Sequence, residues 1–294
     1  LQGKQLECER TLNRAPPGFR DVDERGVELL WWMNAPLYGQ TDAGAILYRT
    51  FCEKMSGEPH ALPRCANEPC VFSAGFGKHG RDRVTNCLYV DDGRICSDPS
   101  PAGVDAHAKV KAKLNEFQIK FGTVNQTDDM FLGSNRKVTS PGTCKVYAET
   151  YIDLQIKRYA KGDISGYPAS WSHTPADETL VNAFEAASLA RARAPLELEK
   201  RYMSLFGALL HASKFRPEIC ACLGMLGTCL TFSTEELYDC MMRVLVYLGR
   251  TKTLGVTFSK HGIGANKLKV FADSNWAITR SISGFTFILA GGSI

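Results

Sequence analysis

The sequence predicts an α+β fold, with antiparallel strands in its first half and helices in its second half. Strand-like apolar runs flank Asp-Asp-Gly at residues 91–93, which is typical of a β-hairpin turn. Between residues 202 and 248, apolar residues recur at helical spacing. Two further strand-like segments, 268–272 and 284–289, follow the helices. We therefore expect small antiparallel sheets followed by a helical bundle.

The elements can be taken in order. Residues 1–20 are rich in proline and glycine and predict an extended segment, whereas 56–70 and 162–197 predict loops. The predicted helices are 42–55, 104–121, 151–160, 202–213, 217–231 and 234–248. The predicted strands lie at 70–72 and 83–97, and in a hairpin formed by 131–133 and 145–147 with Pro141-Gly142 as its turn.

Composition narrows the class of protein. The chain has 294 residues, 44% of them hydrophobic and 22% charged, which is enough for one large or two smaller globular domains. A net charge of +4 is compatible with a nucleic-acid partner without identifying one. No apolar run reaches the length of a membrane span, so we expect no membrane partner.

The cysteines predict a reducing environment. There are eleven of them, an odd number, with no Cys-x-x-Cys pair and no signal peptide ahead of them. His60, Cys65 and Cys70 lie close in sequence, but no second ligand pair follows, so a zinc site is not favoured. We expect free thiols and an intracellular location in the cytoplasm, the nucleus or a virus-like particle, and not secretion.

Asp91 and Asp92 are the residues most suggestive of chemistry. Adjacent carboxylates at a hairpin tip are well placed to hold a divalent cation, because hard cations such as Mg²⁺ prefer carboxylate oxygens. The alternative is that Asp-Asp-Gly forms only a turn. The hypothesis to test is a Mg²⁺ site at this tip, with Mn²⁺ as a substitute.

Several motifs, in this order along nearly the whole chain, resemble the polymerase region of copia-type retrotransposon polyproteins. Of these, only Tyr89-Val90-Asp91-Asp92 is specific by itself. The others are Pro16-Pro17-Gly18-Phe19, Leu37-Tyr38-Gly39, Phe131-Leu132-Gly133, residues 202–210, Arg216-Pro217-Glu218-Ile219, residues 243–251 and residues 272–277.

The resemblance implies a reverse transcriptase fold and activity. It implies partial fingers and palm with an antiparallel sheet in 1–150, a helical thumb and connection in 151–262, and the beginning of a ribonuclease H-like domain in 263–294. It also implies RNA-directed DNA synthesis by two-metal nucleotidyl transfer, with deoxynucleoside triphosphates and an RNA or DNA template-primer as partners.

The resemblance also implies roles for individual residues. Asp91 and Asp92 would be catalytic metal ligands, with Tyr89 and Val90 near the primer and Tyr38 and Gly39 near the nucleotide. Asp273 would be the first ribonuclease H carboxylate. The nucleic-acid contacts would come from three arginines, namely Arg216, Arg243 and Arg250.

The chain departs from the family pattern in ways that keep other functions open. The family's first catalytic aspartate would precede Leu1, and Gln40-Thr41-Asp42 replaces the usual Leu-Lys-Gln, so we expect this chain alone to be inactive as a polymerase. The alternatives are a non-catalytic nucleic-acid-binding remnant of such an element and a general magnesium-dependent phosphotransferase.

Overall fold

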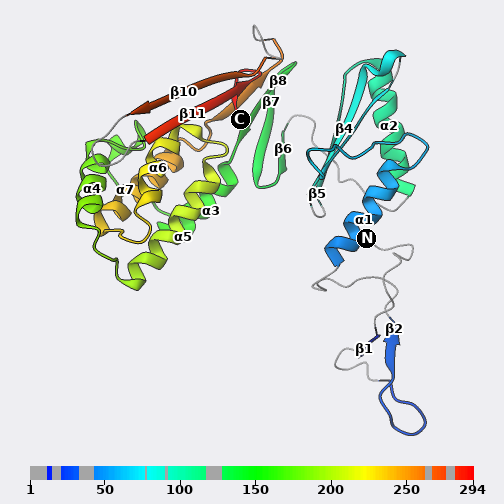
Figure 1. Cartoon of the computed structure of the whole chain (residues 1–294), viewed down its shortest axis with the longest axis horizontal. Coiled ribbons are helices and arrows are strands. Elements are labelled where there is room, and N and C mark those ends of the chain that lie inside the picture. The colour runs from blue at the N-terminus through cyan, green and yellow to red at the C-terminus, as the bar shows by residue number, and fades with distance from the viewer. Residues whose placement is uncertain are drawn as a thin grey trace. The chain divides into compact units, whose positions relative to one another are not determined.

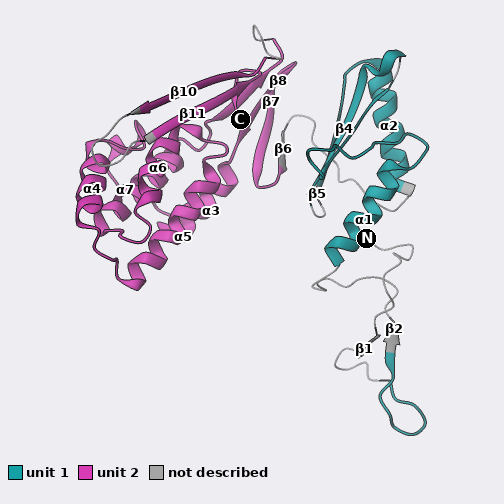
Figure 2. Ribbon diagram, viewed as in Figure 1, with its two compact units in different colours: residues 1–123 teal, residues 124–294 magenta. Residues whose placement is uncertain are grey.

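The computed structural model describes residues 12–14, 21–32, 43–76, 78–89, 92–116, 128–261, 267–275 and 282–294. Its contacts divide the chain into two units, residues 1–123 and 124–294 (Figure 2). The fold is mixed, with helices and small antiparallel sheets (Figure 1). The expected boundary near residue 150 is corrected to 123/124, because strand pairing joins 134–147 to residues 255–259.

The first unit is built around a three-stranded antiparallel sheet in the order β3-β4-β5. Phe72, Val84, Val110 and Leu114 are fully buried between this sheet and the helices, and Phe51 meets Phe72 edge-on. The elements are β1 (Leu12–Arg14), β2 (Leu30–Trp32), α1 (Ala43–Ser56), β3 (Val71–Phe76), β4 (Asp82–Tyr89), β5 (Asp92–Ser97) and α2 (Pro101–Glu116).

The second unit combines a helical bundle with two sheets of order β6-β7-β8-β9 and β10-β11-β12. Its helices are α3 (Glu149–Tyr159), α4 (Glu178–Ala190), α5 (Leu196–Ala212), α6 (Cys220–Thr228) and α7 (Glu235–Arg250). Its strands are β6 (Asp128–Phe131), β7 (Ser134–Ser140), β8 (Thr143–Tyr147), β9 (Gly255–Ser259), β10 (Lys269–Asn275), β11 (Ile282–Leu289) and β12 (Gly292–Ser293).

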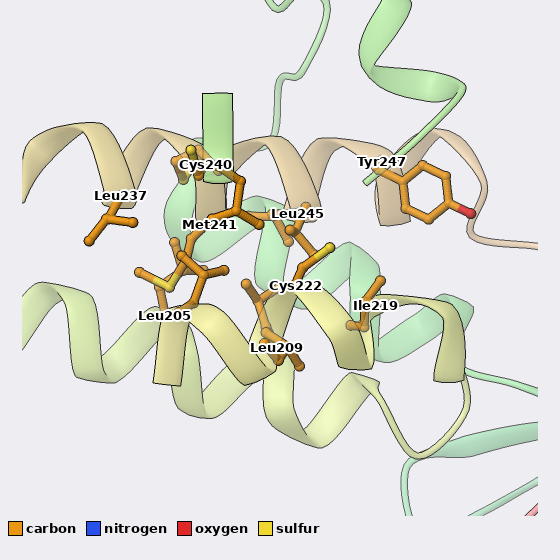
Figure 3. Packing of buried hydrophobic residues seen from close by; sticks show 14 of the residues in the cluster. Leu205, Leu209, Ile219, Cys222, Leu237, Cys240, Met241, Leu245 and Tyr247 are labelled. Atoms are coloured by element: carbon orange, nitrogen blue, oxygen red, sulfur yellow. The ribbon is translucent and has the colours of Figure 1, made fainter. Parts of the chain in front are cut away.

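Helix α7 is the centre of the bundle. Thr234 caps its N-terminus by accepting a hydrogen bond from the Leu237 backbone N–H at 3.2 Å. Leu237, Met241 and Leu245 then follow at helical spacing and pack against α5 and α6 (Figure 3). Because this stripe is fully buried, α7 aligns the rest of the bundle.

The structure corrects four predicted elements. Residues 178–190 form α4 where a loop was expected, because Asp177 caps a stretch that contains no proline or glycine. Leu132 and Gly133 form the turn between β6 and β7 and do not belong to the β7–β8 hairpin. Residues 255–259 form β9, which was not predicted. The bundle contains α3 and α4 as well as the three helices expected.

Candidate nucleic-acid interface

The strands on either side of Val90-Asp91 extend further than the sequence indicated. The register pairs Tyr89 with Asp92 and Leu88 with Gly93. Asp92 and Gly93 belong to strand β5, which corrects the expected Asp-Asp-Gly turn. Tyr89 is exposed, whereas Val90 and Asp91, like Tyr38 and Gly39, lie outside the described residues.

The expected metal chemistry stays a prediction. Among the side chains that the structure describes, no three histidine, cysteine or acidic groups come together in a way that could hold a metal ion. Asp273 lies on β10, is exposed, and accepts a hydrogen bond from the Ser274 backbone N–H at 2.9 Å. The metal-ligand roles of Asp91, Asp92 and Asp273 therefore stay predictions.

Arg216, expected on a nucleic-acid surface, is instead part of the core of the second unit. Its side chain is 1% exposed and lies over the ring of Tyr247, 5.2 Å from the centroid. Its guanidinium donates to Glu218 Oε1 at 2.5 Å and to the carbonyl and hydroxyl of Thr251 at 3.0 and 2.6 Å. A buried guanidinium with every partner internal cannot reach a phosphate, so this expectation is corrected.

Arg243 and Arg250 also have internal partners. Arg243 lies over Trp171 and forms an ion pair with Asp177, the cap of α4. Arg250 donates to the carbonyls of Ile164, Tyr167 and Pro168, which ties the preceding loop to the end of α7. Both arginines therefore hold the bundle together, and neither supports the expected nucleic-acid contact.

The structure points to a different cationic surface, on the sheet of β7, β8 and β9. These three strands contain Arg136, Lys137 and Lys145 but no acidic residue, whereas the fourth strand of the sheet, β6, pairs Asp128 with Lys137 and Asp129 with Arg136. In antiparallel strands, directly paired residues project to the same face and neighbours along a strand alternate. The register therefore gathers one set of side chains on a single face, here called the polar face: Asn135, Lys137, Thr143, Lys145, Tyr147, Thr257 and Ser259.

Two contacts confirm this arrangement. The Thr143 hydroxyl donates to the Ser259 hydroxyl across β8 and β9, at 3.4 Å. The Lys145 ammonium lies 5.7 Å from the centre of the Tyr147 ring, two residues along the same strand. The hydroxyls and the ammoniums thus form a row of hydrogen-bond donors on the polar face, whereas the Asn135 amide is bound to Thr150 of α3.

The opposite face of this sheet is apolar. Val256 is buried, and Gly292 of β12 approaches so closely that an added Cβ would lie 2.5 Å from the Phe258 ring and 2.8 Å from Val256. This close approach requires glycine at position 292. Because the apolar face packs against β12, the alternation along β9 leaves Thr257 exposed on the polar face.

The polar face carries an electrostatic conflict. Lys137 and Lys145 are direct cross-strand partners, and Lys137 is exposed while Lys145 is half-buried. Like charges in this relation destabilise a sheet. On its other side, Lys137 is the direct cross-strand partner of Asp128 on β6, so Lys145 is the lysine of the pair that faces no acidic residue in the register. An anion bound between the two ammoniums would relieve their repulsion.

Sequence reasoning missed this face for an identifiable reason. It recognised Lys145-Val146-Tyr147 as a strand, but it did not extend the partner strand over residues 134–140 or find β9. One signal was available in the sequence. Residues 134–147 contain no acidic residue, and Pro141-Gly142 predicts a turn that joins two strands within this range.

Comparison with known proteins supplies one relative and corrects the expected kinship. The chain is 33% identical over 98 residues to the secreted RxLR effector protein 161 of Plasmopara viticola, an alignment that covers 32% of this chain and 68% of that protein. No family model and no solved structure matches the chain. The match is to an effector and not to a retrotransposon polyprotein. The expected copia-type kinship and polymerase function are therefore wrong.

Proposed function

The chain belongs to the same family as the secreted RxLR effector protein 161 of Plasmopara viticola, and we propose that it is a binding protein whose partner is nucleic acid. The polar face of β7, β8 and β9 would hold the phosphate backbone, without preference for sequence.

The observation that carries this proposal is the direct cross-strand pairing of Lys137 with Lys145. Facing residues of an antiparallel pair lie about 5 Å apart at Cβ, so two flexible lysines can bind neighbouring phosphates of one strand. Neutralising phosphates releases counterions, which favours binding and makes it dependent on salt.

The neighbouring side chains support a phosphate backbone as the ligand. Thr257 and Ser259 on β9, with Thr143 on β8, carry hydroxyls of the kind that commonly bind phosphate and sugar oxygens. Lysine is a hydrated point charge and gives little base discrimination by itself. We therefore expect similar affinities for strands of different sequence.

We propose an intracellular place of action, in a reducing compartment. No two of the ten cysteines that the structure describes are joined by a disulfide. A chain rich in cysteines that are not paired in disulfides is typical of reducing surroundings. No helix in the described part of the chain is long and apolar enough to cross a bilayer.

The test is fluorescence anisotropy with a labelled mixed-sequence single strand and the matching duplex. We expect Lys137→Glu/Lys145→Glu to weaken binding by on the order of tenfold or more at low salt, uniformly across sequences. The matched control is Lys109→Glu/Lys200→Glu, which makes the same change in net charge at exposed helical lysines already paired with Asp105 and Glu197.

The two variants separate local contact from net charge. Equal losses in both variants would show that only overall charge matters and would overturn the proposed face. No measurable binding by the wild-type chain would overturn the proposed partner.

A further inference from the structure

Strand β10 is an open edge of its sheet. The strand order is β10-β11-β12, and β10 pairs along its whole length with β11 only, among the residues that the structure describes (Figure 1). Residues 269–274 are exposed on both faces of the ribbon, with Val270 at 55% and Phe271 at 57%. An exposed edge presents unpaired backbone donors and acceptors that can template another strand.

The register of β10 with β11 assigns the side chains to two faces. Val270 and Ala272 pair with Phe287 and Phe285, so these four residues share one face. Phe285 is 72% exposed, and its ring meets that of Phe287 edge-on at 5.6 Å. Lys269, Phe271 and Asp273 lie on the opposite face, because residues alternate along a strand.

We propose that β10 pairs with β10 of a second copy of this chain, antiparallel and about a two-fold axis through Phe271. A two-fold axis perpendicular to the sheet puts the same face of both copies on the same side of the joined sheet. Because residues alternate between the two faces, the two residues of each cross-strand pair must both have odd numbers or both have even numbers. With the axis at Phe271, Lys269 faces Asp273 of the partner copy, and the partner copy's Lys269 faces Asp273.

The charges select this register. An axis at residue 269 or residue 273 would set lysine against lysine or aspartate against aspartate, which destabilises a cross-strand pair. With the axis at Phe271, the two charged residues of β10, Lys269 and Asp273, each face a residue of opposite charge. The edge is therefore complementary to itself. It also sets each Val270 beside an Ala272 and brings the two exposed Phe271 rings together, removing apolar surface from water.

The result would be a six-stranded sheet that runs through both copies. Such an interface is small, so the dimer should form reversibly at micromolar concentrations. It is independent of the polar face of β7, β8 and β9 and of the proposed nucleic-acid partner.

The test is sedimentation velocity of the full 294-residue chain from about 1 to about 200 µM, a range suited to small transient interfaces. We expect a concentration-dependent monomer–dimer equilibrium for the wild-type chain. Lys269→Asp and Asp273→Lys should each abolish it, because each change places two like pairs across the axis. The double variant Lys269→Asp/Asp273→Lys restores both opposite-charge pairs and should restore the dimer.

Two further results decide the proposal. A monomeric wild-type chain at the highest concentration, or a double variant that dimerises no better than the single variants although its melting is unchanged, would overturn it. Lys267→Asp is the register control, since an axis at Val270 would set Lys267 against Asp273. Loss of the dimer in that variant would contradict the axis at Phe271.

Discussion

The second unit uses positive charge in two opposite ways. In the bundle, Arg216, Arg243 and Arg250 each bind carbonyls, hydroxyls or carboxylates of their own unit. On the sheet, Lys137 and Lys145 face each other, and β6 pairs Asp128 with the other side of Lys137. The first group stabilises the fold, whereas an external anion could interact with the second group.

This difference shows why counting cations does not locate a nucleic-acid surface. All five residues carry the same charge in the sequence, and the arginines were expected to contact nucleic acid because of the family resemblance and because they lie around the predicted helical bundle. What separates them is burial and the number of internal partners. A cation available to a ligand is one that the fold has not already paired.

Replacing Arg216 should give the largest effect on stability and none on binding. Arg216→Met removes a buried guanidinium and leaves Glu218 and the Thr251 hydroxyl without that partner, so we expect a loss of about 3 kcal/mol in the free energy of unfolding. Urea unfolding measures it. Nucleic-acid affinity at equal folded concentration should be unchanged, and a large drop in affinity would contradict the structural role.

Replacing Arg243 should have a smaller effect that depends on pH. The hydrogen bond from Arg243, with help from Thr179, lowers the pKa of the Asp177 carboxyl below its ordinary value. Stability linked to a lowered carboxyl pKa is present above the unfolded value of about 4 and is lost as pH falls through the folded value.

We therefore expect the wild-type chain to lose more stability than Arg243→Met between pH 5 and pH 3. Thermal melts across that window measure the difference. Parallel pH profiles for the two proteins would show that the ion pair contributes nothing to the cap of α4.

Reversing one sheet lysine should give the smallest change in stability, in the opposite direction. Lys145→Glu converts the cross-strand pair with Lys137 into an opposite-charge pair, which should stabilise the sheet by about 0.5 kcal/mol. The same variant should bind nucleic acid more weakly than the wild-type chain. A variant that is both less stable and unaltered in binding would show that the two lysines do not repel each other.

The sequence was most informative where one face of an element is buried. The pattern of Leu237, Met241, Val244 and Leu245 predicted α7 to within two residues at either end, and all four are buried. Helix α4 was missed because prolines at 175 and 195 suggested a loop, although the helix lies entirely between them. Prolines indicate where a helix can begin or end, but they do not indicate whether the residues between them form a helix.

The candidate site could not be predicted in the same way, because pairing partners are distant in sequence. Thr257 joins the polar face only through the pairing of β8 with β9, about 110 residues further along the chain. Likewise, the hairpin register moved Asp92 into a strand, whereas local turn chemistry favoured Asp-Asp-Gly as the turn. Register is decided by the packing of whole strands, which no short motif contains.

The most direct test of the central claim is the salt dependence of single-strand binding by the wild-type chain and by Lys137→Ala/Lys145→Ala. Each phosphate contact contributes about 0.7 to the slope of log affinity against log salt for a single strand. If both lysines bind phosphates, the slope of the double variant should be shallower by about 1.4. An unchanged slope would show that neither lysine contacts the backbone, and the polar face would not be the nucleic-acid site.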